Sequence, residues 1–303
     1  MKFLYNQNSE PVGIPDAFNS FFKPVWTQSS FEKILAGSNF DVKIEHNISG
    51  HWPPDCLRVK AEHSNKIVST QNCLAANNFQ LPLNLNNLCI ADGIFDASGE
   101  YQLGISTADC LAVAYFLDIS PGCQITALVH AGWKGFCAGI HLKAIEMIAE
   151  AVHQKSALNS SVFLPKLQVH ISPAVFGKSY ECGSNVLNLL HNHFNKAKEK
   201  FINWNSELES IWNNCSDVKF KKNMPNAIFP KNTNSLNELK IFPDFQLLAA
   251  CEIVGAGIDP KNISIFRENT YENINLPSYR ASTHGHGDGS KRMTTLLTPK
   301  ILP

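Results

Sequence analysis

Two apolar runs in the middle of the chain decide its fold. Residues 107–135 read TADCLAVAYFLDISPGCQITALVHAGWKG, with a continuous apolar run at 111–117 and a second run at 124–129. Runs of this length are typical of strands covered on both faces, and the Pro121-Gly122 pair between them is typical of a turn. We therefore expect an antiparallel pair of strands whose outer ends, just before residue 111 and just after residue 129, lie side by side.

Reactive side chains stand at both of these outer ends. Cys110 precedes the first strand and His130 follows the second, so the pairing would bring a thiol and an imidazole to one edge of the sheet. We take both as candidate catalytic residues. Their neighbour Asp109 is a third candidate, because a carboxylate there could orient a histidine or assist a proton transfer, although a turn-capping role is also typical of such a position.

The residues after the second strand allow two interpretations. Gly132 and Gly135 could let backbone N–H groups approach a ligand closely, with Trp133 between them as a stacking face. Alternatively, the glycines form a tight turn from a strand into a helix, and the indole belongs to the core. Spacing alone favours the structural interpretation.

A cysteine with a histidine supports two kinds of chemistry. In the first, Cys110 is a thiolate nucleophile and His130 is its base, as in thiol hydrolases. In the second, both bind a soft divalent metal ion, and His63, in the turn between predicted strands at 57–61 and 66–69, is the natural third ligand. Two imidazoles and a thiolate leave one tetrahedral position open, which is the arrangement of a catalytic zinc site. On spacing alone, an ordinary surface histidine is the simpler interpretation of His63.

Two other histidine pairs are weaker candidates. His191 and His193 lie two residues apart on a predicted helix at 183–194, so they point to different sides and cannot chelate one ion together. The segment His284-Gly285-His286-Gly287 is better explained as a flexible polar loop. Neither pair supports a multi-copper cluster, which needs many convergent imidazoles.

The rest of the chain favours an α+β fold. Strands outnumber clear helices and do not alternate with them regularly, so we expect a single mixed-sheet domain with flanking helices. Proline-broken residues 1–56 are expected to form an irregular N-terminal segment packed on the core, and 57–303 the main domain, with a loop-rich insertion at 195–242. The other expected helices begin at Ile140 and at Pro243-Asp244, and the other expected strands cover 167–171, 262–266 and 292–297.

Composition excludes several classes of protein. The 303 residues are 44% hydrophobic and 17% charged, and 26 basic residues balance 26 acidic ones, which argues against nucleic acid as a partner. No apolar stretch approaches the ~20 residues that span a bilayer, so we expect no membrane partner. The nine cysteines include no C-x-x-C pair, and no secretory signal is visible, so we expect reduced thiols and a cytoplasmic location.

The motifs already described resemble the signature of the laccase-domain family, formerly called multicopper polyphenol oxidases and now regarded as purine nucleoside phosphorylases. TADC followed about twenty residues later by HAGW(R/K)G is unlikely by chance. The likeness covers roughly residues 57–297 and extends to Ala91-Asp92-Gly93, Ser172-Pro173-Ala174, Tyr180-Glu181, Ser278-Tyr279-Arg280 and Arg292-Met293.

The resemblance implies a fold similar to that of cysteine-dependent toxin deamidases, and one Zn²⁺ ion bound by His63, Cys110 and His130. The implied partners are purine nucleosides (adenosine, inosine, guanosine and methylthioadenosine) and phosphate, and the implied reactions are phosphorolysis and adenosine deamination. The candidate phosphate-binding cations are Lys134 and Arg280.

Tyr180 or Trp133 could stack on the base, and either could instead belong to the core. The sequence departs from the family pattern at four places. Ser64 follows the first histidine where the family has glycine, Lys134 replaces an arginine and loses its planar fork, and Ser179 and Ala281 replace a cysteine and a second arginine. These changes leave the metal ligands intact and affect substrate preference and rate.

Three other functions remain open. A metal-free Cys–His hydrolase or amidase would keep its activity after chelation, and a non-catalytic metal-binding protein would hold metal but turn over no nucleoside. Polyphenol oxidation ranks lowest, because one cysteine and two histidines cannot assemble a multi-copper cluster. The sequence leaves the oligomeric state undetermined.

Overall fold

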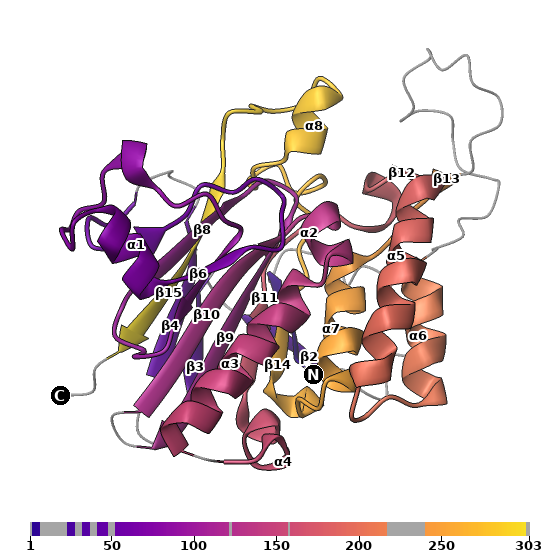
Figure 1. The fold of residues 1–303 in the computed structure, drawn as a ribbon. Coiled ribbons are helices and arrows are strands. Elements are labelled where there is room, and N and C mark those ends of the chain that lie inside the picture. The colour runs from indigo at the N-terminus through magenta and orange to yellow at the C-terminus, as the bar shows by residue number, and fades with distance from the viewer. Residues whose placement is uncertain are drawn as a thin grey trace.

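A computed structural model describes residues 2–6, 23–27, 32–36, 41–47, 52–120, 123–156, 158–216 and 240–300. Two sheets and a layer of helices make up the fold (Figure 1). The larger sheet has eight strands in the order β2 (Lys23–Thr27), β1 (Lys2–Asn6), β14 (Ile263–Phe266), β11 (Gln168–Ile171), β9 (Leu111–Ser120), β10 (Cys123–Ala131), β7 (Gly93–Asp96) and β6 (Ile67–Ser69).

The second sheet has five strands, and a two-stranded sheet completes the β structure. The five-stranded order is β3 (Glu32–Ala36), β4 (Asp41–Asn47), β15 (Met293–Lys300), β8 (Leu103–Thr107) and β5 (Leu57–Arg58), and the small sheet pairs β12 (Cys182–Gly183) with β13 (Lys240–Ile241). The α-helices are α1 (Thr70–Ala76), α2 (Trp133–Cys137), α3 (Ile140–Ser156), α4 (Ser160–Phe163), α5 (Ser184–Ala197), α6 (Ser206–Ser216), α7 (Phe245–Gly255) and α8 (Tyr279–Thr283). The α+β class is therefore confirmed.

The central strand β9 explains how the layers stack. Because successive side chains of a strand point to opposite faces, Val113, Tyr115 and Leu117 join the core beneath the helices, whereas Ala114 and Phe116 join the core shared with the second sheet. Both faces of β9 are therefore buried, as its unbroken apolar run indicates. Figure 1 shows α3, α7, α5 and α6 side by side over the outer face of the larger sheet.

The expectation of an irregular segment over residues 1–56 needs correction. Strands β1 and β2 extend one edge of the eight-stranded sheet, and β3 and β4 belong to the five-stranded sheet. Pro24 lies in β2, the edge strand, and edge strands are where sheets accommodate proline. The partners of β4 lie in β15, about 250 residues away, which a reading of local sequence does not reveal.

Most other expected elements are present where the sequence places them. Helices α3, α5 and α7 and strands β11, β14 and β15 match their expected positions to within a few residues. The expected insertion at 195–242 contains helix α6, whose Trp212 is fully buried against α7, and residues 217–239 lie outside the described part. The Pro121-Gly122 turn also lies outside it. No helix in the described ranges is long and apolar enough to cross a bilayer.

A buried histidine pair joins the two sheets. His46 of β4 bonds through Nε2 to Nε2 of His170 on β11 at 3.0 Å, and through Nδ1 to Oγ1 of Thr295 at 2.9 Å. Burial lowers the pKa of His46 to about 3. In the unfolded chain, His46 takes up a proton below about pH 6.5. In the folded protein it stays neutral down to about pH 3.

We expect this pair to make the fold sensitive to acid. Between about pH 6.5 and pH 3 the unfolded state binds one more proton than the folded state at His46, so stability should fall by up to about 1.4 kcal/mol for each pH unit. Urea unfolding at several pH values should give a steeper acid loss for the wild type than for His46→Asn, which does not titrate. Equal slopes would contradict the prediction.

Candidate metal centre

Three side chains from separate segments converge at one edge of the larger sheet. Ligand atoms of His63, Cys110 and His130 all lie within 4.8 Å of one another, and the two imidazole rings have centroids 4.9 Å apart. Cys110 and His130 meet because β9 and β10 are antiparallel, with Leu111 opposite Ala131 and Ala112 opposite His130. The strand pairing expected from the apolar runs is therefore present, and it brings the thiol to the imidazole.

His63 reaches the site through a loop in an uncommon backbone conformation. Its φ is +63°, in the left-handed region that costs a residue with a side chain free energy. The loop precedes β6, and β6 pairs with β7 in the same sheet. His63 is exposed and Cys110 is half-buried, whereas His130 is 4% exposed. The site is therefore open to solvent on the side of His63 and buried on the side of His130.

Asp92 holds two of the three segments together. Its Oδ1 accepts hydrogen bonds from Nδ1 of His130 at 2.7 Å and from the backbone N–H of His63 at 2.9 Å. Its Oδ2 accepts from the N–H and the hydroxyl of Ser64 at 2.7 and 2.8 Å, and from the N–H of Glu62 at 3.2 Å. A single fully buried carboxylate thus fixes the histidine loop and the ring of His130. Nothing in the local sequence assigns this role to Asp92.

Asp92, His130 and Cys110 shift one another's pKa values toward their charged forms. Burial by itself raises the pKa of Asp92, but hydrogen bonds from His130 and Ser64 hold it well below its ordinary range. Burial lowers the pKa of His130, yet hydrogen bonds with Asp92 and Cys110 raise it to about 9. Burial also raises the pKa of the Cys110 thiol, and the hydrogen bonds and charges of His130 and His63 bring it down to about 7. A substantial fraction of Cys110 is therefore thiolate at neutral pH.

Both glycines of the HAGWKG motif make room for the histidine loop. A Cβ on Gly132 would lie 2.8 Å from Cδ2 of His63 and 3.0 Å from Sγ of Cys110, and a Cβ on Gly135 would lie 2.6 Å from the backbone oxygen of Ser64. These contacts favour the structural interpretation of the glycines. Gly132 is also the N-terminal cap of α2.

Asp109 does not bond to a histidine. Its Oδ1 accepts from the hydroxyl of Thr270 at 2.7 Å, and its Oδ2 accepts from the backbone N–H of Arg280 at 2.6 Å. The histidine-orienting carboxylate is Asp92, so the expectation that Asp109 would orient a ligand histidine is corrected on this point. Asp109 instead anchors the segment that begins α8. Its φ of +84° is left-handed, and it immediately precedes the thiol of Cys110.

Two of the three proposed substrate-binding residues lie together. The guanidinium carbon of Arg280 is 5.1 Å from the centroid of the Tyr180 ring, and its Nη1 donates to the backbone oxygen of Glu181 at 2.9 Å. The Tyr180 ring also packs edge-on against Phe245, with centroids 5.7 Å apart. Lys134 lies on α2, where it is exposed and its Nζ is 5.6 Å from the centroid of the Trp133 ring.

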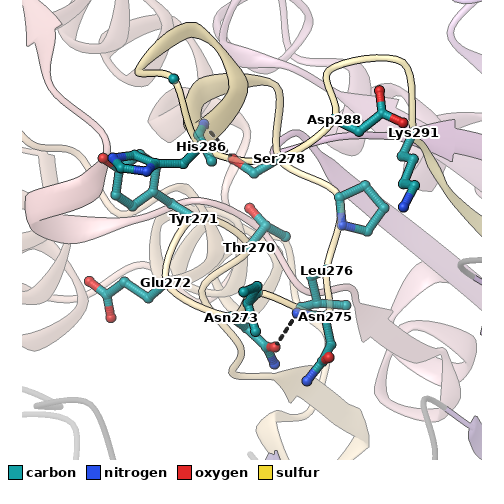
Figure 2. Close-up of a pocket in the computed structure, with 15 residues that line it drawn as sticks. Thr270, Tyr271, Glu272, Asn273, Asn275, Leu276, Ser278, His286, Asp288 and Lys291 are labelled. Atoms are coloured by element: carbon teal, nitrogen blue, oxygen red, sulfur yellow. Dashed lines mark hydrogen bonds between the residues drawn. The ribbon is translucent and has the colours of Figure 1, made fainter.

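A cavity of about 570 Å³ lies next to the Asp109 anchor (Figure 2). Thr270 and Ser278 line it. Thr270 donates its hydroxyl hydrogen bond to Asp109, and Ser278 caps α8 by accepting from the N–H of Ala281. His286, Asp288 and Lys291 form another part of the wall. In the same loop, Nδ1 of His284 pairs with the Tyr271 hydroxyl at 3.0 Å. The volume is within the ~300–1,000 Å³ of small-molecule sites.

Comparison with known proteins places this geometry in context. A profile of the family described as multi-copper polyphenol oxidoreductase laccase matches residues 46–218. The comparison with curated proteins gives no match.

Solved structures share the fold. A Neisseria meningitidis protein of the DUF152 family is 17% identical with a TM-score of 0.55, covering 90% of this chain and all of its own. YfiH of Bacillus licheniformis is 17% identical with a TM-score of 0.54, and the match covers 81% of this chain and 74% of YfiH. YlmD of Geobacillus stearothermophilus is 15% identical, also with a TM-score of 0.54, and the match covers 87% of this chain and 93% of YlmD. At these identities the likeness shows a shared fold.

Proposed function

Because the chain belongs to the multi-copper polyphenol oxidoreductase laccase family, we propose that it is a zinc-dependent purine nucleoside phosphorylase with adenosine deaminase activity. The observation that carries the proposal is the convergence of His63, Cys110 and His130 within 4.8 Å. Adenosine, inosine, guanosine and methylthioadenosine are the proposed substrates, together with phosphate.

The donor atoms fit a zinc ion. Two imidazole nitrogens and a sulfur are typical zinc ligands, and three protein ligands leave a position for a reactant. Because Nδ1 of His130 bonds to Asp92, Nε2 is the nitrogen of that ring that could bind an ion, and such outer carboxylates are typical of metal-bound histidines. When bound, zinc would supply Lewis acidity that polarises an oxygen of the reactants.

The family's name implies a multi-copper cluster, and the described residues do not provide one. Among the described residues, only two groups contain three or more possible ligands for a metal ion. The group of His63, Cys110 and His130 has one cysteine and two histidines. Multi-copper oxidation needs several ions in close contact. Polyphenol oxidation therefore remains the weakest of the candidate functions.

Phosphorolysis requires attack of a phosphate oxygen on C1′ of the sugar while the bond from C1′ to the base nitrogen breaks. The released base then takes up a proton. We assign the phosphate to Lys134 and Arg280, whose positive charges offset its negative charge. Arg280 uses Nη1 on the oxygen of Glu181, and its planar group carries further N–H donors. Tyr180, which packs beside Arg280, is the proposed platform for the base.

The test is to supply the purified protein with adenosine and phosphate, and to measure adenine, ribose 1-phosphate, inosine and hypoxanthine by chromatography. We expect adenine from phosphorolysis of adenosine, inosine from its deamination, hypoxanthine from phosphorolysis of that inosine, and ribose 1-phosphate equal to adenine and hypoxanthine together. Cys110→Ala should abolish all four products, because it removes the sulfur ligand. No product from the wild type, or equal product from the variant, would reject the assignment.

One observation favours a second function, that of a metal-free thiol hydrolase or amidase. Cys110, His130 and Asp92 form a chain of hydrogen bonds resembling a nucleophile, its base and the group that orients the base. This function predicts that iodoacetamide inactivates the enzyme and that chelation does not. The zinc-dependent function predicts that chelation abolishes activity and that added Zn²⁺ restores it. Stoichiometric metal without turnover of any nucleoside would indicate a metal-binding protein.

A further inference from the structure

A second group of possible metal ligands lies inside the helical layer. His141 of α3, His193 of α5 and Glu252 of α7 place their ligand atoms within 4.8 Å of one another. These three helices lie side by side in Figure 1. His141 and Glu252 are fully buried and His193 is 8% exposed. None of the three belongs to the group of His63, Cys110 and His130.

Both imidazoles point at one carboxylate oxygen. Nε2 of His141 is 2.7 Å and Nε2 of His193 is 2.8 Å from Oε2 of Glu252. The other oxygen, Oε1, accepts a hydrogen bond from Nε1 of Trp212 at 2.9 Å. Trp212 therefore fixes the carboxylate in the orientation that presents Oε2 to the two histidines.

The ring of His141 is held with equal firmness. It stacks on Phe136 with centroids 4.3 Å apart, and its Nδ1 is buried without a hydrogen-bond partner among the described residues. Its one polar contact is therefore made at Nε2, the atom that faces Glu252.

A purely structural role explains this group poorly. Glu252 lies in the middle of α7, whose neighbouring side chains are otherwise mostly apolar, and burying a carboxylate costs free energy that well-packed apolar side chains would not. Two nitrogens and one carboxylate oxygen are, by contrast, a frequent ligand set for Zn²⁺ and Fe²⁺. The fixed carboxylate is the kind of outer support that such sites have.

The group has a route to solvent. A cavity of about 610 Å³ between α3 and α5 is lined by His193 together with Cys137, Gly139 and Lys143. Gly139 has no side chain to cover the ring, since a Cβ there would lie 3.4 Å from Cε1 of His193. An ion and a water ligand could therefore enter on this side.

We propose that His141, His193 and Glu252 form a second site, for a divalent transition-metal ion such as Zn²⁺ or Fe²⁺, that opens through His193 into the cavity between α3 and α5. When the ion binds, the proton on each Nε2 moves to Nδ1 of the same ring, so that both imidazoles stay neutral, and the ion replaces both hydrogen bonds. Ligands about 2.0–2.1 Å from a tetrahedral ion stand about 3.3 Å apart, so the group opens by roughly 0.5 Å on binding.

The test uses the double variant His63→Ala/Cys110→Ala, in which the first site is destroyed. After removal of metal, this protein is titrated with Co²⁺ and its bound ion is counted by elemental analysis. We expect one Co²⁺ per chain with weak visible bands and without the intense thiolate charge-transfer band that the wild type should add through Cys110. Absence of a bound ion would overturn the proposal. This outcome is independent of catalysis, so it does not depend on the proposed function.

Further variants on the same background locate the ion. His193→Asn should lower the affinity for Co²⁺ at least 100-fold, whereas His153→Asn, which changes an exposed histidine of α3, should leave it unchanged. Circular dichroism checks that each variant is folded. If His193→Asn does not fold, the ¹⁵N imidazole signals of the double variant decide instead, because Co²⁺ should shift those of His141 and His193 and leave His153 unaffected. Equal affinity in His193→Asn, or shifts confined to other histidines, would overturn the proposal.

Discussion

Gly132→Ala should release the metal and lower kcat/KM for nucleoside phosphorolysis by about 100-fold, the cost typical of displacing a reacting group by about 1 Å. The backbone at Gly132 has φ −65° and ψ 164°, which alanine adopts readily, so backbone strain contributes little. The effect comes from space. The new Cβ would lie 2.8 Å from Cδ2 of His63 and 3.0 Å from Sγ of Cys110, and it would push the exposed histidine loop away from the thiol.

The chain offers a matched control for this variant. Gly183 caps α5 with φ −75° and ψ 161°, and a Cβ there would approach only the end of the flexible Asn185 side chain at 2.8 Å. Gly183→Ala should keep both metal content and turnover. Metal content by elemental analysis and initial rates by chromatography check both variants. Full zinc occupancy in Gly132→Ala would show that the ligands can shift without cost.

Asp92→Asn should weaken metal binding by about 10–100-fold, the range typical for loss of an outer carboxylate. Asparagine has one acceptor oxygen for donors that come from Glu62, His63, Ser64 and His130. The variant should also lose about 1–3 kcal/mol of stability for each buried donor left without a partner. The His130 ring should then lose its fixed tautomer. Competition with a chelating dye gives the metal affinity, and urea unfolding gives the stability.

Asp96 separates the two effects. It ends β7, the strand that begins directly after Asp92, and it is 1% exposed. Its carboxylate accepts hydrogen bonds from Thr70, Ser98, Glu100 and Tyr101 without contacting a metal ligand. Asp96→Asn should destabilise the fold to a similar degree and leave metal affinity intact. If the two variants bound zinc equally well, Asp92 would be no more than a structural support.

The part of the site that the sequence predicts best is the part made by neighbouring strands. Cys110 and His130 are twenty residues apart, and the apolar runs between them indicate their pairing directly. His63 follows from the need for a third ligand and from family resemblance. This reasoning does not find Asp92, because its donors come from two segments, residues 62–64 and His130, and a lone aspartate before a strand has many ordinary roles.

The same limit applies to the fold. The positions of α3, α5 and α7 follow from periodicity and capping, whereas the pairing of β4 with β15 depends on residues about 250 positions apart. In the sequence, Glu252 does no more than interrupt the apolar run at 247–258. Its partners His141 and His193 lie 111 and 59 positions away, so local patterns do not connect them. A single acidic residue in a buried helix is the signal that could have indicated them.

Glu252 also restricts how the helices can assemble. Helix α7 is buried on all sides, and besides Glu252 it carries the buried Gln246, whose Nε2 donates to the backbone oxygens of Ser172 and Phe266. Turning it by one residue, about 100°, would carry the carboxylate away from all three donors into hydrocarbon. Glu252 and Gln246 together thus restrict the rotation of a helix whose other side chains are mostly apolar, at some expense in free energy. Glu252→Leu should accordingly loosen the contacts of α7 with α3, α5 and α6, while the hydrogen bonds of Gln246 still hold the start of the helix.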